Sequence, residues 1–161
     1  PALGWRAFPV ETAVRFLLGG AALAIVIQGA SYFAGTPSVP MEKLFRDRPS
    51  VLMMMALGIL VAPLVEETLF RGCIYPVVAR TFGVPAGIVT TGILFGLAHS
   101  PQLAGAWKQV VLVTVVGIVL TYVRSRTGTV FASFLVHIGY NSFLFGTFYF
   151  VTGGLRNFPG S

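Results

Sequence analysis

The sequence predicts an all-α membrane protein, a polytopic helical bundle with about five spanning segments. Hydrophobic residues make up 55% of the 161 residues and charged residues only 10%, whereas soluble proteins carry roughly 25% charged residues. The mean hydropathy is +0.83, and long apolar runs alternate with short polar stretches. These features argue against a water-soluble globule, a disordered tail and a coiled coil.

The expected spanning segments are apolar runs bounded by prolines or charged residues. A helix needs about 20 mostly apolar residues to cross a hydrocarbon core of about 30 Å. The runs that approach or exceed this length are 16–33, 51–79, 85–101, 109–123 and 127–155. The polar stretch 37–48 separates the first two runs, and we expect it to form a loop with a short interfacial helix.

The second run is expected to form a single helix although it contains three ionisable residues, Glu66, Glu67 and Arg71. Apolar character resumes after them, and the midpoint of the run falls at Val65, beside the two glutamates. In the third run, Gly92 and Gly96 form a GxxxG pair, which predicts close packing against another helix.

The net charge of +6 indicates membrane anchoring rather than nucleic-acid binding, because the basic residues flank apolar runs and do not cluster. When successive loops are assigned to alternate sides of the membrane, most of the basic residues fall into two sets of four and five. This near balance leaves the membrane orientation open. One side receives Arg6, Arg80, Arg124 and Arg126, and the other Lys43, Arg46, Arg48, Lys108 and Arg156.

Cys73 is the only cysteine, and its apolar setting favours a packing role.

The chain is expected to form one membrane domain over 1–161. It begins with Pro1, and no basic and apolar leader follows, so we expect it to be a piece of a longer chain.

Ionisable residues at membrane depth are the candidate functional residues, since they are costly there and usually face a bundle interior or a water cavity. Glu67 and Arg71 are spaced i, i+4 and share one helix face, while Glu66 is rotated by about 100° from Glu67. This spacing suggests that Arg71 neutralises Glu67 and leaves Glu66 to handle a proton. The alternative is a structural ion pair beside a carboxylate that reaches for the membrane surface.

Two further pairs with i, i+4 spacing lie on the third and fifth segments: Phe95 with His99, and His137 with Asn141. Taken alone, each has a structural explanation, a histidine at a helix end or hydrogen bonding between helices. Together with Glu66 they place a carboxylate, two imidazoles and a carboxamide at comparable depth. These groups suit a base that activates water and a site that stabilises an oxyanion.

The three motifs Glu66-Glu67-x-x-x-Arg71, Phe95-x-x-x-His99 and His137-x-x-x-Asn141, in this order on apolar segments, resemble the CPBP family. This family, also called Abi, groups type II CAAX prenyl endopeptidases with bacteriocin-processing and immunity proteins. The resemblance covers about 51–153, which is the expected catalytic core. It implies an all-helical intramembrane glutamic endopeptidase without a covalent nucleophile.

By motif position, the resemblance implies that Glu66 is the general base and that His99 binds or activates the water. His137 and Asn141 would stabilise the tetrahedral oxyanion, while Glu67, Arg71 and Phe95 would support them. No cofactor and no metal are expected, because the metal-binding motif HExxH is absent. If a metal is bound, its ligands would be Glu66, His99 and His137.

Other protease chemistries fit the sequence less well. The only aspartate, Asp47, lies in a polar loop, which removes an aspartyl dyad. Ser31, within Gly29-Ala30-Ser31-Tyr32, faintly resembles a rhomboid-type serine motif but is more readily explained by packing or hydrogen bonding.

The main hypothesis is therefore an intramembrane endopeptidase that cleaves a membrane-associated or prenylated CAAX-type peptide. The first alternative is a membrane scaffold or bacteriocin immunity protein without catalysis. A weaker alternative is a proton-coupled transporter, since buried carboxylates and histidines also build proton relays. The expected partners are a peptide or lipidated peptide and the lipid bilayer, without nucleic acid, and the expected location is a prokaryotic cytoplasmic membrane. The sequence leaves the oligomeric state open.

Overall fold

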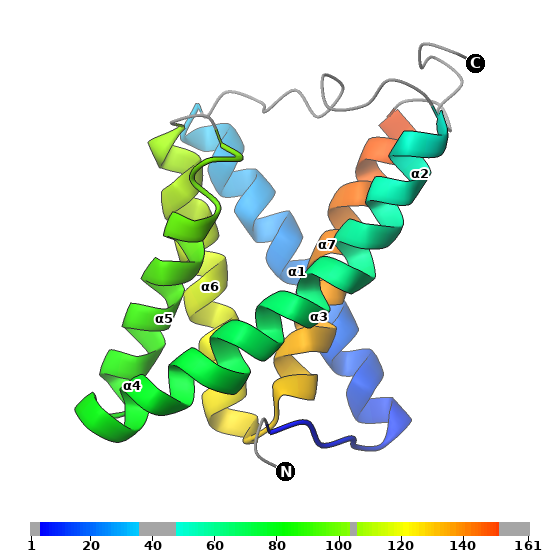
Figure 1. Ribbon diagram of the computed structural model, residues 1–161. Helices are drawn as coiled ribbons and strands as arrows, with labels where there is room; N and C mark the ends of the chain where they lie inside the picture. Colours follow the sequence, from blue (N-terminus) through cyan, green and yellow to red (C-terminus); the bar gives the residue numbers. More distant parts are fainter. Residues whose placement is uncertain (1–3, 36–47, 104–105, 152–161) are drawn as a thin grey trace.

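The computed structural model describes residues 4–35, 48–103 and 106–151, and every regular element within these ranges is a helix (Figure 1). The chain begins with α1 (Val10–Phe33) and continues with a 35-residue helical segment, Arg48–Phe82. Next come α5 (Val84–Ala98), α6 (Trp107–Thr127) and α7 (Val130–Val151).

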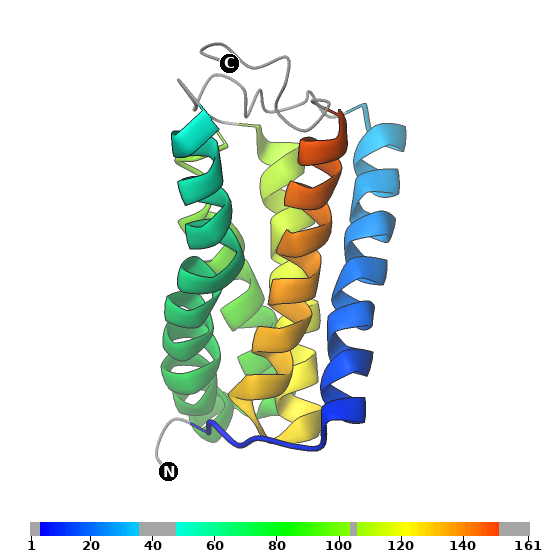
Figure 2. The same cartoon turned by 90° about the vertical axis from the view of Figure 1, so that its right-hand side faces the viewer.

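Four of these helical segments are long and apolar enough to cross a membrane, and α5 is a shorter apolar helix. The long segments are α1, Arg48–Phe82, α6 and α7, and together with α5 they confirm the five-segment bundle that the sequence predicts. In the side view of Figure 2 these elements stand side by side with their axes roughly along one direction. The chain is a multi-pass membrane protein.

The segment Arg48–Phe82 changes its helical register twice. It consists of α2 (Arg48–Ala56), the π-helical turn η2 (Leu57–Val61), α3 (Ala62–Glu67), the π-helical turn η3 (Thr68–Ile74) and α4 (Tyr75–Phe82). A proline stands two residues after the end of each π-turn, Pro63 after η2 and Pro76 after η3. Because proline has no N–H, the regular hydrogen-bond ladder cannot continue through it. The residues predicted to be functional, Glu66 and Glu67, lie between the two π-turns.

Close helix packing depends on glycines at two crossings. On α5, a Cβ at Gly92 would meet Ile118 and a Cβ at Gly96 would meet Thr114, both on α6. This confirms the packing expected from the GxxxG pair. Where α1 crosses α7, a Cβ at Gly139 would meet the backbone carbonyl of Leu17. The absence of side chains therefore lets two backbone pairs approach closely.

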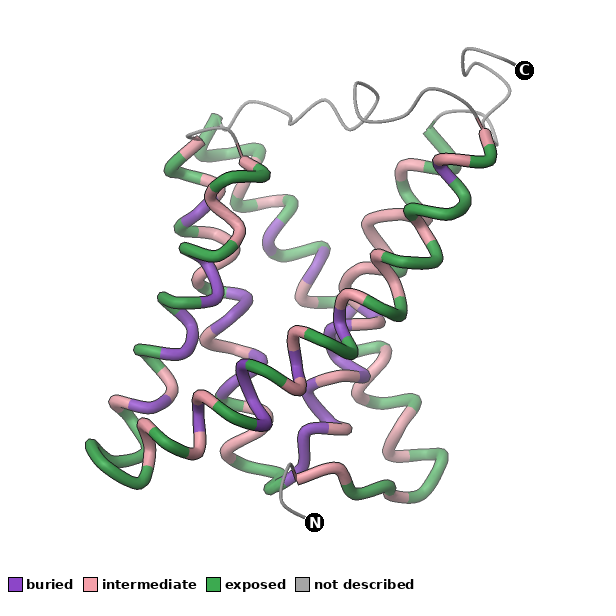
Figure 3. The backbone as a smooth tube through the Cα atoms, in the orientation of Figure 1, coloured by how far each residue is buried: buried purple, intermediate pink, exposed green. Residues whose placement is uncertain are grey.

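The bundle is most completely buried where its helices cross, near the middle of the molecule (Figure 3). One hydrophobic cluster comprises Ile27, Val116, Leu120 and Val136, which come from α1, α6 and α7. The stretch before α1 closes one end of the bundle, because Trp5 packs its ring edge-on against Phe134 of α7.

The helices extend beyond some of the apolar runs. α1 begins at Val10 and includes Glu11 and Arg15, and α6 continues past Arg124 to Thr127. Charged residues limit the apolar length of a segment, but they do not end a helix that leaves the hydrocarbon. α6 ends instead at Gly128, which adopts a left-handed conformation with φ 70°, a conformation that glycine adopts readily.

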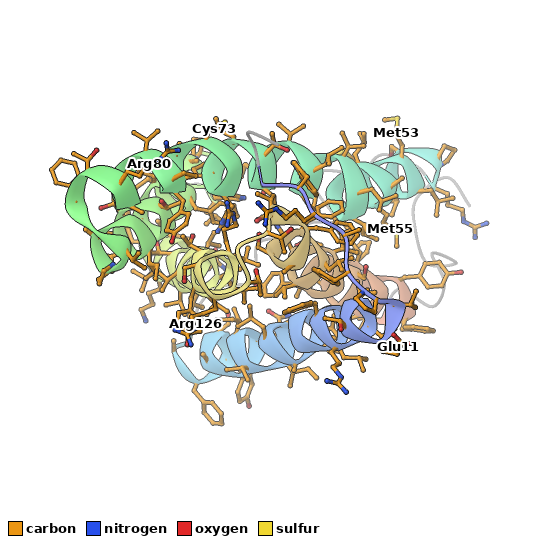
Figure 4. The ribbon with its side chains drawn as sticks, turned by 90° about the horizontal axis from the view of Figure 1, so that it is seen from below. Glu11, Met53, Met55, Cys73, Arg80 and Arg126 are labelled. Atoms are coloured by element: carbon orange, nitrogen blue, oxygen red, sulfur yellow. The ribbon has the colours of Figure 1, made fainter. Side chains whose placement is uncertain are left out.

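Two expectations from the sequence are not confirmed, the interfacial helix in 37–48 and the packing role of Cys73. The interfacial helix expected in 37–48 falls almost wholly on 36–47, which lie outside the described residues. The packing role expected for Cys73 is wrong, since its side chain is exposed and lies on the outer side of the long helical segment (Figure 4). An apolar neighbourhood along the sequence does not separate a lipid-facing position from a core position in a membrane helix.

Candidate active site

The buried base of the candidate site is the ion pair between Glu67 and Arg71. Nη1 of Arg71 donates to Oε1 of Glu67 at 2.8 Å, and both side chains have no exposed surface. The i, i+4 pairing expected from the sequence is confirmed. An isolated charge would be very costly here, so each residue depends on the other.

Arg71 also ties the long helical segment to α6 and α5. Its Nη2 donates to the carbonyl of Gly117 at 2.8 Å and its Nε to Oγ1 of Thr121 at 3.3 Å, both on α6. Its guanidinium carbon lies 4.5 Å from the ring centroid of Phe95 on α5, which is within the range of a cation–π interaction. One arginine thus fixes three helical segments relative to each other.

Glu67 orients His137, which α7 brings into the same buried region. Nδ1 of His137 lies 3.0 Å from Oε1 of Glu67. A carboxylate that pairs with arginine is an acceptor only, so Nδ1 of His137 carries a proton. Because the other ring nitrogen lies on the opposite side of the imidazole, Nε2 is directed away from Glu67.

His99 is oriented in a similar way by the backbone of its own helix. Its Nδ1 lies 2.8 Å from the carbonyl oxygen of Phe95, which can only accept, so this nitrogen is also protonated. The Phe95 ring lies near both imidazoles, with centroid distances of 4.5 Å to His99 and 5.8 Å to His137. Phe95 therefore orients His99 through its carbonyl and packs against both rings.

Glu66 stands where the two Nε2 atoms converge. Its Oε1 lies 3.8 Å from Nε2 of His99, and its Oε2 lies 3.7 Å from Nε2 of His137. Its side chain is 25% exposed, compared with 0% for Glu67. Both gaps exceed direct hydrogen-bond length, which leaves the Glu66 carboxylate accessible to another molecule.

The two adjacent carboxylates contact opposite nitrogens of one imidazole, Glu67 at Nδ1 and Glu66 at Nε2 of His137. With Arg71 positive, a protonated His137 makes this group of four electrically neutral. The expected rotation between Glu66 and Glu67 is therefore present. Glu67 belongs to the buried ion pair, while Glu66 faces both histidines.

Asn141 is used differently from the other predicted site residues. Its Nδ2 donates to the carbonyl of Gly58 in η2 at 2.7 Å, and this bond links α7 to the long helical segment. It lies one helical turn beyond His137 on α7, and it retains a second amide N–H and a carbonyl oxygen. The structure thus brings Glu66, His99 and His137 together, while Asn141 contacts the backbone beside them.

The metal alternative, with Glu66, His99 and His137 as ligands, can be tested against this arrangement. In residues 4–35, 48–103 and 106–151, no group of three or more His, Cys, Asp or Glu side chains is placed to hold a metal ion. The alternative of a metal bound by Glu66, His99 and His137 stays a prediction, and we derive no step through a metal.

Three residues of this network were missed from the sequence: Gly58, Gly117 and Thr121. Two of them, Gly58 and Gly117, contribute backbone carbonyls, which no side-chain motif can indicate. Thr121 donates to the Gly117 carbonyl at 2.7 Å and accepts from Arg71. For Thr121 the sequence offered one indication of a buried polar contact, namely a threonine that follows Gly117 by one helical turn in an apolar segment.

Comparison with known protein families gives a match that covers this site. A family described as "Type II CAAX prenyl endopeptidase Rce1-like" matches residues 48–143, which is more than half of the chain. The chain belongs to this Rce1-like family. All seven predicted site residues lie within the matched region. The range 51–153 expected for the catalytic core stays a prediction.

A curated relative extends beyond the Rce1-like match. An Escherichia coli protein named "Uncharacterized 24.3 kDa protein" is 32% identical in an alignment 134 residues long that covers 78% of this chain and 59% of that protein. The chain therefore spans 59% of the length of this relative. No solved structure matches the chain. The Rce1-like family is generally a family of membrane proteases.

Proposed function

We propose that this protein is an intramembrane endopeptidase in which Glu66 activates water for the hydrolysis of a peptide bond. The observation that carries the proposal is the position of Glu66, whose carboxylate faces Nε2 of His99 at 3.8 Å and Nε2 of His137 at 3.7 Å. Membership of the Rce1-like family supports the reaction class. The partial exposure of Glu66, unlike Glu67, suits a base that must meet water.

In the proposed reaction, Glu66 accepts a proton from water while the water oxygen attacks the substrate carbonyl carbon. His99 accepts a hydrogen bond from the same water through its unprotonated Nε2. Protonated His137 and the second amide N–H of Asn141 stabilise the oxyanion that forms. When the carbon–nitrogen bond breaks, Glu66 returns the proton to the leaving amine, and the products are an amine and a carboxylic acid that keeps the second proton of the water.

The proposed substrate is a peptide held at the membrane, with a prenylated CAAX-type C-terminus as the first candidate because of the family's description. The proposed location is a prokaryotic cytoplasmic membrane. A scaffold or immunity protein is the alternative, and it is favoured by the extent of the buried Glu67–Arg71 network, which has a structural use without any catalysis.

The test compares the parent chain with Glu66→Gln and with the matched control Glu11→Gln, which removes an exposed carboxylate in the first turn of α1. Each protein is purified in mild detergent and incubated with membrane peptides that include farnesylated CAAX peptides, and products are identified by mass spectrometry. We expect cleavage by the parent and the control, and a loss of about 10²-fold or more in Glu66→Gln. Retained cleavage in Glu66→Gln would contradict the mechanism, and no cleavage by any protein would favour the scaffold.

A further inference from the structure

The carbonyl of Gly58 is left without a partner in its own helix by the combination of η2 and Pro63. In an α-helix it would accept from the N–H of residue 62, but Ala62 donates to the carbonyl of Leu57 instead. In the π register it would accept from the N–H of residue 63, and Pro63 has none. Neither helical register can therefore satisfy this carbonyl.

Asn141 on α7 supplies the missing donor through its Nδ2, at 2.7 Å. An unpaired carbonyl within a membrane is costly, because lipid offers no donor in place of water. The second π-turn has the same arrangement of a displaced donor followed by a proline. In η3, Tyr75 donates to the carbonyl of Phe70, and Pro76 follows, yet Asn141 bonds only the turn before Pro63.

The same glycine is a point of close approach between the two helical segments. A Cβ at Gly58 would lie 2.6 Å from Cε2 of Phe145, and Phe145 stands one turn after Asn141 on α7. Gly58 therefore accepts a hydrogen bond from Asn141 and lies next to the ring of Phe145, and these two residues are on the same face of α7. His137, one turn before Asn141 on α7, faces the two glutamates.

The long helical segment and α7 are therefore joined at two levels, at Gly58 by Asn141 and at α3 by His137. We propose that Asn141 is a positioning residue, which sets the register of Glu66 against His137 by donating to the Gly58 carbonyl that Pro63 leaves unpaired. Its catalytic consequence rests on the proposed function, whereas the coupling between Asn141, Gly58 and Pro63 does not. This use of the amide is additional to the contact with the oxyanion proposed above.

The test restores the missing backbone donor. Pro63→Ala provides an N–H for the Gly58 carbonyl or lets Ala62 return to it, so Asn141 becomes dispensable for that carbonyl. The matched control is Pro76→Ala, which makes the same change after η3. We expect Asn141→Ala to lower the melting temperature by about 5 °C in the parent and in Pro76→Ala. In Pro63→Ala the same substitution is expected to lower it by less than about 2 °C.

A kinetic readout separates positioning from stability alone. Asn141→Ala is expected to lower kcat for a cleaved peptide and leave KM unchanged, and Pro63→Ala but not Pro76→Ala is expected to recover part of that kcat. The proposal is overturned if Asn141→Ala melts with the parent, or if its effect is equal in both proline backgrounds. If the chain cleaves no probe, the melting temperatures still decide the coupling.

A second variant covers the case in which Pro63→Ala does not fold. Asn141→Asp has the same shape, and at a pH where its carboxylate is ionised it cannot donate and would face the Gly58 carbonyl oxygen. We expect it to melt below Asn141→Ala, and melting at or above Asn141→Ala would overturn the proposal.

Discussion

Glu66 and Glu67 are adjacent in the chain, and we predict that the neutral substitution of Glu67 lowers stability whereas that of Glu66 leaves it nearly unchanged. Glu67→Gln keeps the shape of the side chain but leaves the charge of Arg71 uncompensated at 0% exposure. Removing one partner of a buried ion pair typically costs about 3–5 kcal/mol. Arg71 retains the Gly117 carbonyl, Thr121 and the ring of Phe95, which favours the lower end, about 3 kcal/mol.

For a protein of this size, about 3 kcal/mol lowers the melting temperature by about 6–12 °C. The assay is thermal unfolding in mild detergent, with Glu66→Gln as the matched neighbour. Glu66 is 25% exposed and makes no contact shorter than 3.7 Å with either histidine. We therefore expect Glu66→Gln to melt within about 2 °C of the parent.

A charge-neutral double variant tests the cause of the loss. Glu67→Gln/Arg71→Met removes both charges, and Thr121 continues to donate to the carbonyl of Gly117. The double variant should therefore melt above Glu67→Gln alone. The reasoning is refuted if Glu67→Gln melts with the parent, or if the double variant is less stable than the single one.

Two other predictions concern the packing of α1 against α7 and the effect of a metal chelator on cleavage. Gly139→Ala is expected to destabilise the protein by at least about 2 kcal/mol, because its Cβ would meet the carbonyl of Leu17. Gly146→Ala on the same helix meets nothing within 4 Å and should change stability by less than about 1 kcal/mol; equal effects in thermal unfolding would contradict the α1–α7 crossing. Peptide cleavage is expected to persist with 1,10-phenanthroline, since the described residues place no three suitable side chains around a metal position; inhibition that added zinc reverses would contradict this.

The number of helices and the convergence of Glu66, His99 and His137 could be predicted from the sequence because both depend on local patterns. Apolar length reports spanning segments, and ionisable residues at membrane depth must find partners inside the bundle. The i, i+4 spacing of Glu67 and Arg71 likewise predicts a contact that any regular helix brings about.

The π-turns and the partners of Arg71 could not be predicted in the same way. Arg71 donates to the backbone carbonyl of Gly117, and η2 with Pro63 leaves the Gly58 carbonyl unpaired in its helix. No side-chain pattern indicates either carbonyl. Pro63 and Pro76 indicate interruptions in the long segment, but a proline alone does not tell whether the helix kinks, ends or widens. The outward direction of Cys73 was missed because both faces of this segment are apolar.

The shortness of α5 affects the lipid around the site. Its 15 residues span about 22 Å, roughly 8 Å less than a typical hydrocarbon core. A bilayer accommodates a short apolar segment by thinning locally, and His99 immediately follows the last residue of this helix. We expect the headgroup layer to dip toward His99 and Glu66, which would supply water for hydrolysis from the membrane surface without a long aqueous channel.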